Sequence, residues 1–210
     1  MHDMILRIAL LALPVLIAVT VHEVAHGWIA FKLGDNTAQQ AGRLTLNPIK
    51  HLDLFGTLVF IITQMVGWAK PVPVNPYNLK NPRKDMIWVA AAGPAANILM
   101  AVGFSLLYHL TSRMAGSYPS DMIIVPVLLI SRVGVIINVG LATFNLLPVP
   151  PLDGSNIAMG LLPRDMARIY QSITPYGFLI LLVLIFSGLV DKVIFPIISF
   201  MTNLLLYGQW

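Results

Sequence analysis

The sequence predicts an all-α integral membrane protein with about 5–6 hydrophobic segments, and three observations support this fold class. Hydrophobic residues make up 57% of the 210 residues and charged residues only 10%, whereas soluble chains carry about 25% charged residues. The mean hydropathy is +0.80. Several apolar stretches approach the roughly 20 residues that a helix needs to cross the hydrocarbon core of a bilayer.

The first predicted span covers residues 4–33. It ends at Lys32-Leu33-Gly34, a basic last turn followed by glycine, which is a typical helix stop. Its apolar part is too long for a secretory signal, and His22, Glu23 and His26 stand where a small-residue cleavage site would be. We therefore expect a span that is retained in the mature protein.

Further spans are predicted at residues 86–110, 122–147, 173–188 and 193–207. The last two are short apolar runs separated by a turn, so they form either a hairpin of short helices or one bent span with an amphipathic tail. The chain shows no repeat and no soluble domain, and residues 1–210 are predicted to form a single transmembrane domain.

Residues 54–66 form a shorter apolar segment after the first span. At 1.5 Å per residue a helix of this length covers about 20 Å, which is too short to cross the bilayer. Loops rich in proline, asparagine and basic residues flank it on both sides. A re-entrant or interfacial segment, with both flanks on one side of the membrane, fits better than a crossing.

With that topology, the loops within 32–84 and 148–172 share one side and hold nine basic residues, against three on the other side. The positive-inside rule then places these loops in the cytoplasm and the N-terminus outside. The net charge of +4 is spread between apolar spans, which argues against a nucleic-acid-binding face. The chain has no cysteine, which excludes disulfides, thiolate metal sites and cysteine nucleophiles.

The chemistry is concentrated in the first span, which contains His22-Glu23-Val24-Ala25-His26. Histidines at i and i+4 project from one face of a helix and can bind one metal ion, most often zinc, with the glutamate as general base. In a soluble helix this pattern is frequently a solvated face. Here the ionisable groups lie in a membrane span, where each costs about 2.5–3.5 kcal/mol to insert, and Glu23 is the only glutamate in the chain. We therefore predict a catalytic metal site.

A catalytic zinc site normally uses three protein ligands and a water, so one more ligand is required. The remaining His and Asp residues on the same predicted side are the candidates: Asp35, His51, Asp53, Asp85, Asp153 and Asp165. Asp153 stands out because prolines and a glycine around it interrupt the helix, and irregular backbone at membrane depth is tolerated where it lines a cavity. If residues 54–66 are re-entrant, the chain crosses the membrane an even number of times between the histidines and Asp153. All three side chains then lie on the same side of the membrane.

The motifs together resemble the site-2 protease family of intramembrane zinc metalloproteases, peptidase family M50. The resemblance rests on HEVAH in a span, on Gly93-Pro94-Ala95-Ala96-Asn97, and on the segment from Asn145 to Asp153-Gly154 that reads N-x-x-P-x-P-x-L-D-G. Two loop segments also resemble family signatures: residues 42–48 and residues 67–74. The chain is similar to a compact member, without a PDZ or CBS domain and without a span before the HEVAH helix.

The resemblance implies one Zn²⁺ ion held by His22, His26 and Asp153, with Glu23 as catalytic base. It also implies that Asn97 and Asn145 lie at the active site and contact the substrate backbone or its oxyanion. The alternative for these asparagines is amide hydrogen bonding between packed spans. Residues 42–46 are either an edge strand that receives an unwound substrate or a plain loop.

The expected activity is hydrolysis of peptide bonds within or near transmembrane segments, by zinc-activated water with Glu23 as base. The expected partners are a transmembrane protein or peptide substrate and the lipid bilayer, without nucleic acid; the oligomeric state is left open. The expected location is the prokaryotic plasma (inner) membrane, with the active site towards the cytoplasm. Two alternatives are a non-proteolytic zinc-binding or zinc-transporting membrane protein and an inactive family member that serves as a scaffold.

Overall fold

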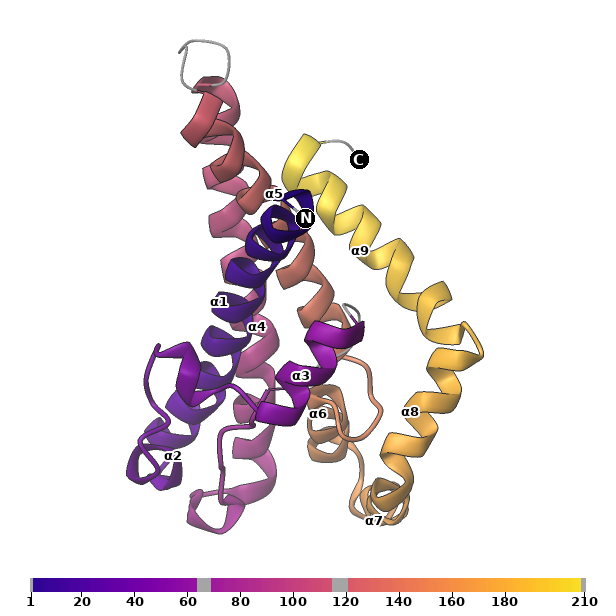
Figure 1. Ribbon diagram of the computed structural model, residues 1–210. Helices are drawn as coiled ribbons and strands as arrows, with labels where there is room; N and C mark the ends of the chain where they lie inside the picture. The colour runs from indigo at the N-terminus through magenta and orange to yellow at the C-terminus, as the bar shows by residue number, and fades with distance from the viewer. Residues whose placement is uncertain (1, 64–68, 115–120, 209–210) are drawn as a thin grey trace.

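The computed structural model describes residues 2–63, 69–114 and 121–208, and within these ranges the chain consists of helices and loops without a strand (Figure 1). Among these described residues, five helices are long and apolar enough to cross a membrane: Leu10–Lys32, Pro82–Met114, Ile123–Asn145, Arg164–Phe186 and Leu189–Tyr207. The predicted all-α fold with about five or six hydrophobic segments is confirmed.

Three long helices form the body of the molecule: α1 (His2–Lys32), α4 (Pro82–Met114) and α5 (Asp121–Asn145). Small residues such as Ala18, Ala90 and Ala101 are buried where these helices meet, and they let helix backbones approach closely, as is usual in membrane proteins. After α1 the chain turns at Gly34, whose φ of 113° lies in the left-handed region that favours glycine. The two histidines predicted to bind a metal face α4, where Val89 and Asn97 contact them.

The C-terminal part is built from shorter helices: α6 (Asp153–Leu161), α7 (Arg164–Ile173), α8 (Gly177–Phe186) and α9 (Leu189–Tyr207). The helix α9 returns to α5, where a small core of Ala101, Val135, Val139 and Leu206 is buried. In Figure 1, α7 is seen end-on at the bottom of the molecule and α8 rises from it towards α9. The apolar run predicted at 173–188 thus continues a helical segment that already begins at Arg164.

The short apolar segment after the first span is α3 (Leu54–Thr63); residues 64–66 of the predicted segment lie outside the described part of the chain. Asp53 caps the helix by accepting a hydrogen bond from the Gly56 N–H at 2.8 Å. Ten residues cover about 15 Å, and Leu54, Phe55 and Ile62 are at least 71% exposed. A re-entrant or interfacial position for α3 stays a prediction.

Candidate metal centre

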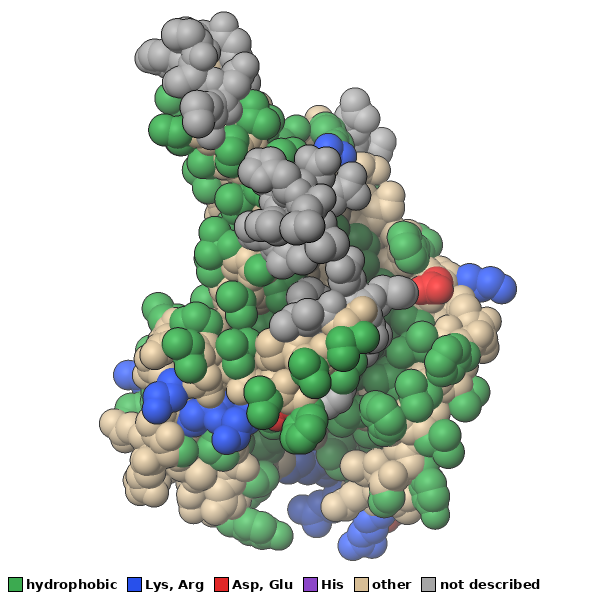
Figure 2. All heavy atoms as spheres, viewed as in Figure 1, with side chains coloured by type: hydrophobic (Ala, Val, Ile, Leu, Met, Phe, Trp, Pro, Cys, Tyr) green, Lys and Arg blue, Asp and Glu red, His purple; other side chains and the backbone are tan. Residues whose placement is uncertain are grey.

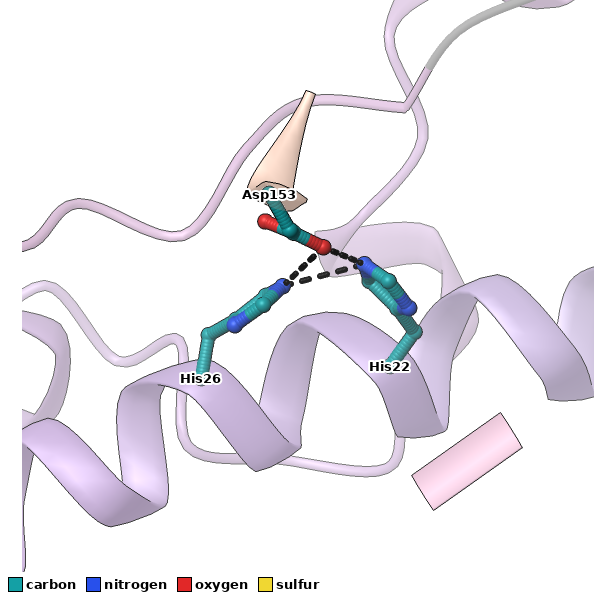
Figure 3. Close-up of side chains that lie close together, drawn as sticks. All are labelled: His22, His26 and Asp153. Atoms are coloured by element: carbon teal, nitrogen blue, oxygen red, sulfur yellow. Dashed lines mark hydrogen bonds and ion pairs between the residues drawn. The ribbon is translucent and has the colours of Figure 1, made fainter. Parts of the chain in front are cut away.

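Three side chains from two distant parts of the sequence meet inside the molecule (Figure 3). His22 and His26 project from the same face of α1, and Asp153 approaches them from the first turn of α6. The two Nε2 atoms are 3.0 Å apart, and the Oδ2 atom of Asp153 lies 3.2 Å from that of His22 and 3.3 Å from that of His26. Both histidines are buried. This is the only group of three or more His, Asp or Glu side chains in metal-binding proximity that the described residues contain.

The hydrogen bonds on the far side of each ring determine which nitrogen carries the proton. The Nδ1 atom of His26 lies 2.7 Å from the carbonyl oxygen of Val89, which can only accept. The Nδ1 atom of His22 lies 2.6 Å from Oδ1 of Asn97, and the amide is oriented this way because its nitrogen donates to the carbonyl of Ala18. Each Nδ1 therefore carries the hydrogen, and in the neutral rings each Nε2 presents a lone pair to the centre.

Two nitrogen lone pairs and a carboxylate oxygen thus face one another. Oδ2 of Asp153 is buried and has no hydrogen-bond donor among the described residues. Buried acceptors are almost always satisfied, and a cation bound between these three atoms would satisfy all of them. Two imidazoles and a carboxylate are a set that catalytic zinc sites use, with water or substrate in the fourth position. The residues therefore fit a zinc ion.

Two glycines make the close approach of these elements possible. A Cβ atom on Gly93 of α4 would lie 2.4 Å from Nε2 of His26 and 2.6 Å from Nε2 of His22. A Cβ atom on Gly154 would lie 2.3 Å from the carbonyl oxygen of Leu146, at the end of α5. Such distances are too short for any side chain, so glycine at these two positions lets α4 and α6 bring the ligands together.

The tertiary structure gives Asn97 a clear structural role. Asn97 is fully buried; its oxygen faces His22, and its amide nitrogen donates to the Ala18 carbonyl at 3.2 Å and to Oδ1 of Asn138 at 2.9 Å. Both amide hydrogens are therefore used inside the protein. These contacts favour orientation of His22 over direct contact with a substrate. The amide nitrogen of Asn145 donates to the Leu141 carbonyl within α5, and the predicted contact of both asparagines with substrate stays a prediction.

Sequence reasoning missed Asn138. It is fully buried in α5 and donates to the carbonyl of Gly134 while accepting from Asn97. An amide in the middle of a predicted span is costly unless it is paired. This cost could have shown from the sequence that Asn138 needs a hydrogen-bond partner in the protein, but the sequence could not identify that partner.

Glu23 is held by a loop. Its Oε2 atom accepts a hydrogen bond of 2.7 Å from the backbone N–H of Val72. The residue is half-buried and lies between the two histidines in α1, where an adjacent carboxylate can reach a water at the metal. This contact joins the candidate base to the segment that follows α3.

The other candidate ligands lie elsewhere and have structural partners. His51 is buried and bonds to the Thr45 carbonyl, and Asp53 caps α3. Asp85 accepts from the Asn81 N–H at the start of α4, and Asp165 is exposed beside Arg168. Residues 42–46 form a loop without a strand, and of the segment 67–74 that resembles a family signature, Gly67 and Trp68 lie outside the described residues.

Comparison with known proteins connects this geometry to a family. A sequence profile described as Peptidase family M50 matches residues 10–188, a range that includes both histidines, Glu23 and Asp153. The chain is 38% identical over 195 residues to "Putative zinc metalloprotease YwhC" of Bacillus subtilis (strain 168), covering 90% of this chain and 85% of the relative.

A second relative is more distant. The chain is 29% identical over 187 residues to "Putative zinc metalloprotease Rip2" of Mycolicibacterium smegmatis (strain ATCC 700084 / mc(2)155), covering 87% of this chain and 69% of the relative. No solved structure matches the chain significantly.

Proposed function

The chain belongs to peptidase family M50 and is a zinc metallopeptidase of the membrane, and from this premise we propose that it cleaves peptide bonds within or near the transmembrane segments of other proteins. One observation carries the proposal. Two nitrogen lone pairs and a carboxylate oxygen converge without a hydrogen-bond donor between them. The two nitrogens belong to α1, which is itself long and apolar enough to span the bilayer.

The depth of the ligands supports cleavage inside the membrane. His26 and His22 lie six and ten residues before Lys32, the last residue of the first candidate span. At 1.5 Å per residue these positions are about 9 and 15 Å from the end of the span. A peptide bond that reaches the metal must therefore enter the hydrocarbon layer or its edge.

An apolar groove lies along α1 on the side away from the histidines. The groove has a volume of about 260 Å³ and is lined by Leu13, Leu16, Ile17, Thr20, Val21, Leu46 and Pro48. Its α1 residues lie on a face of the helix turned away from His22 and His26, because successive residues of a helix are about 100° apart. A substrate must therefore reach the ligands from another side of α1, and it must be unwound because a helical backbone hides its carbonyl groups.

In the proposed mechanism His22, His26 and Asp153 would hold one zinc ion, which would polarise the scissile carbonyl and activate a water molecule. Glu23 takes the proton of the attacking water and passes it to the leaving amine. Asn97 and the Val89 carbonyl keep the Nε2 atoms of His22 and His26 directed at the metal. Glu23 itself is steadied through one oxygen by Val72.

We place the active site towards the cytoplasm of a plasma membrane. Figure 2 shows hydrophobic side chains over much of the visible face, while most of the visible Lys and Arg side chains gather towards its lower end. That end carries α2 (Thr37–Gln40) and α7 (Figure 1). The positive-inside rule assigns such an end to the cytoplasmic side.

The test is cleavage of a model transmembrane substrate by the purified protein in lipid nanodiscs, with zinc content measured on the same samples. We expect Glu23→Gln to retain zinc and to lose about 100- to 10,000-fold in kcat, which is the contribution of a general base. Asp153→Ala is expected to lose zinc, whereas Asp53→Ala and Asp165→Ala keep it. Equal cleavage by the wild type and Glu23→Gln would sink the mechanism, and zinc binding without cleavage would favour a zinc-binding or zinc-transporting protein.

A further inference from the structure

A loop segment crosses α1 beside Glu23, and its anchoring has a functional consequence. We call residues 69–75 the strap. Its central residue, Val72, is buried and donates its N–H to Oε2 of Glu23 at 2.7 Å. The flanking residues are Pro71 and Pro73, which have no N–H. Val72 is therefore the only backbone donor of residues 71–73, and the hydrogen bond to Glu23 depends on where the strap lies.

Arg43 anchors the strap on the N-terminal side of Val72. Its guanidinium is almost fully buried and donates to the carbonyl oxygens of Lys70, at 2.6 Å, and Pro71, at 3.4 Å. Burying a guanidinium is costly, so its use on two consecutive carbonyls of a loop indicates that the position of this loop matters. The Lys70 N–H also donates to the His51 carbonyl, which ties the same end of the strap to the loop before α3.

Asp35 anchors the strap on the other side. It is fully buried, and its carboxylate accepts hydrogen bonds from the Asn75 N–H at 2.7 Å and from the Asn78 side chain at 2.8 Å. The N–H and the hydroxyl of Thr37 donate to the same carboxylate. Burial alone would raise the pKa of Asp35, but the hydrogen bonds outweigh it and hold the pKa below its usual value. At neutral pH the carboxylate thus stays charged, and both of its oxygens accept hydrogen bonds.

The sequence of α1 leaves room for the strap. Gly27 lies one turn after Glu23, and a Cβ atom there would lie 2.8 Å from Cγ1 of Val72 and 2.8 Å from Cδ2 of Leu44. Any larger residue would push the strap away from the helix. Glycine at this position therefore lets Val72 come close enough to reach the glutamate.

We propose that Asp35 and Arg43 are positioning residues for peptide hydrolysis, which hold the strap on both sides of Val72 so that its N–H orients the Glu23 carboxylate towards the attacking water. Neither residue contacts the metal ligands, and both act through the strap. The proposal rests on the proposed role of Glu23 as general base. A carboxylate held through one oxygen keeps the other in a fixed direction, and misplacing a reacting group by about 1 Å can cost about 100-fold in rate.

The experiment compares two positioning variants with two matched controls in the full-length protein. Arg43→Gln and Asp35→Asn loosen the strap. Arg83→Gln removes another guanidinium that donates to two backbone carbonyls, those of Met159 and Leu162 at the C-terminal end of α6. Asp85→Asn alters another buried carboxylate that accepts a backbone N–H, that of Asn81. The hydrogen bonds of both control residues go to groups outside the strap. The readouts are kcat, KM, bound zinc and thermal stability in nanodiscs.

We expect Arg43→Gln and Asp35→Asn to lower kcat about 10- to 100-fold while KM and bound zinc stay within about twofold of the wild type. Arg43→Lys, which can still donate to one carbonyl, should recover part of kcat. The controls should keep kcat even where their stability falls as much. Val72→Pro, which removes the donating N–H but also replaces the side chain and fixes φ, should match Arg43→Gln and tests the hydrogen bond if that variant does not fold.

Three results would overturn the proposal: unchanged kcat in Arg43→Gln, Asp35→Asn and Val72→Pro; equal losses of kcat in the two controls; or loss of zinc in parallel with activity. These results are distinct from failure of the proposed function. If Glu23→Gln is inactive while the strap variants cleave normally, Glu23 is the base and the strap does not position it. If Glu23→Gln cleaves normally, the mechanism fails irrespective of the strap.

Discussion

The two histidines and Glu23, the candidate base, lie within two turns of α1, yet different regions of the molecule hold them. The histidines are fixed from inside the helix bundle, by the Asn97 amide and the Val89 carbonyl of α4. Glu23 is fixed from outside the bundle, by a backbone N–H of the strap. One helix thus presents two adjacent functions, and each is oriented by its own surroundings.

This difference separates binding of the metal from the proton transfer. Damage to the bundle contacts is expected to lower the zinc affinity, because a metal ligand that loses its partner loses its orientation. Damage to the strap contacts is expected to lower the rate with zinc still bound. Substitutions on the two sides therefore test whether the two regions are independent.

The largest expected effect is at Gly93, where α4 touches both imidazoles. In Gly93→Ala the new Cβ would lie 2.4 Å from Nε2 of His26, so α4 or the histidines must move apart. We expect zinc affinity to fall by more than about 100-fold, measured by competition with a zinc chelator. Gly103→Ala is the control, because a Cβ there meets nothing within 4 Å. Wild-type zinc affinity in Gly93→Ala would contradict the geometry of the site.

The next effect is at Asn97. Replacement by leucine leaves Nδ1 of His22 without its acceptor, and we expect a 10- to 100-fold loss of zinc affinity, as is typical for partners of metal-binding histidines. Asn97→Asp keeps an acceptor and should retain more of the affinity. A loss of kcat at full zinc occupancy, without a change in affinity, would instead favour contact between Asn97 and the substrate.

Gly27 tests the strap side of the comparison. The Cβ in Gly27→Ala would press on the flexible ends of Val72 and Leu44, so the strap must shift by a few tenths of an ångström or more. We expect kcat to fall about tenfold while chelator competition shows wild-type zinc affinity. A loss of zinc in this variant would mean that the strap and the metal centre are coupled.

Asn138 should give a smaller effect on the bundle side. Asn138→Ala removes one acceptor of the Asn97 amide but leaves the bond to His22 in place. Hydrogen bonds between membrane helices contribute about 0.6 kcal/mol on average, which corresponds to about a threefold change in zinc affinity. An effect as large as that of Asn97→Leu would show that the orientation of Asn97 depends on Asn138.

The smallest effect concerns pH and Asp35. Because the pKa of Asp35 is lowered on folding, its contribution to stability is present above about pH 4 and is lost as the pH falls through the pKa of the folded state. The difference in melting temperature between the wild type and Asp35→Asn should therefore narrow below about pH 4. A difference that is constant from pH 7 to pH 3 would contradict the assignment of Asp35 as a charged acceptor.

Several features of the site could be predicted because they are local. The histidines lie on one face of a helix because four residues turn a helix by slightly more than one revolution, and no tertiary information is needed for that. The helical spans follow from composition and length. Asp153 could be selected from the candidates by its irregular backbone context and by the number of crossings, and the structure brings it to the histidines.

Other features could not be predicted because they join residues far apart in the sequence. The pairs His22–Asn97, Glu23–Val72 and Asn97–Asn138 are separated by 75, 49 and 41 residues. An asparagine in a span must find a partner, but composition does not say which one. Asn97 was associated with the active site from the family motif, whereas its contact with a metal-binding histidine becomes visible only when α1 and α4 are packed together.

By itself the sequence determined that this chain lies in a membrane and that its spans are helical, and it predicted chemistry around a single glutamate between two histidines. These properties depend on hydrophobicity and on the period of the helix, which are set by neighbouring residues. Only the tertiary structure decided which groups orient the ligands and the base. Such contacts depend on how closely helices and loops approach one another, and that distance is set by packing at Gly93, Gly154 and Gly27.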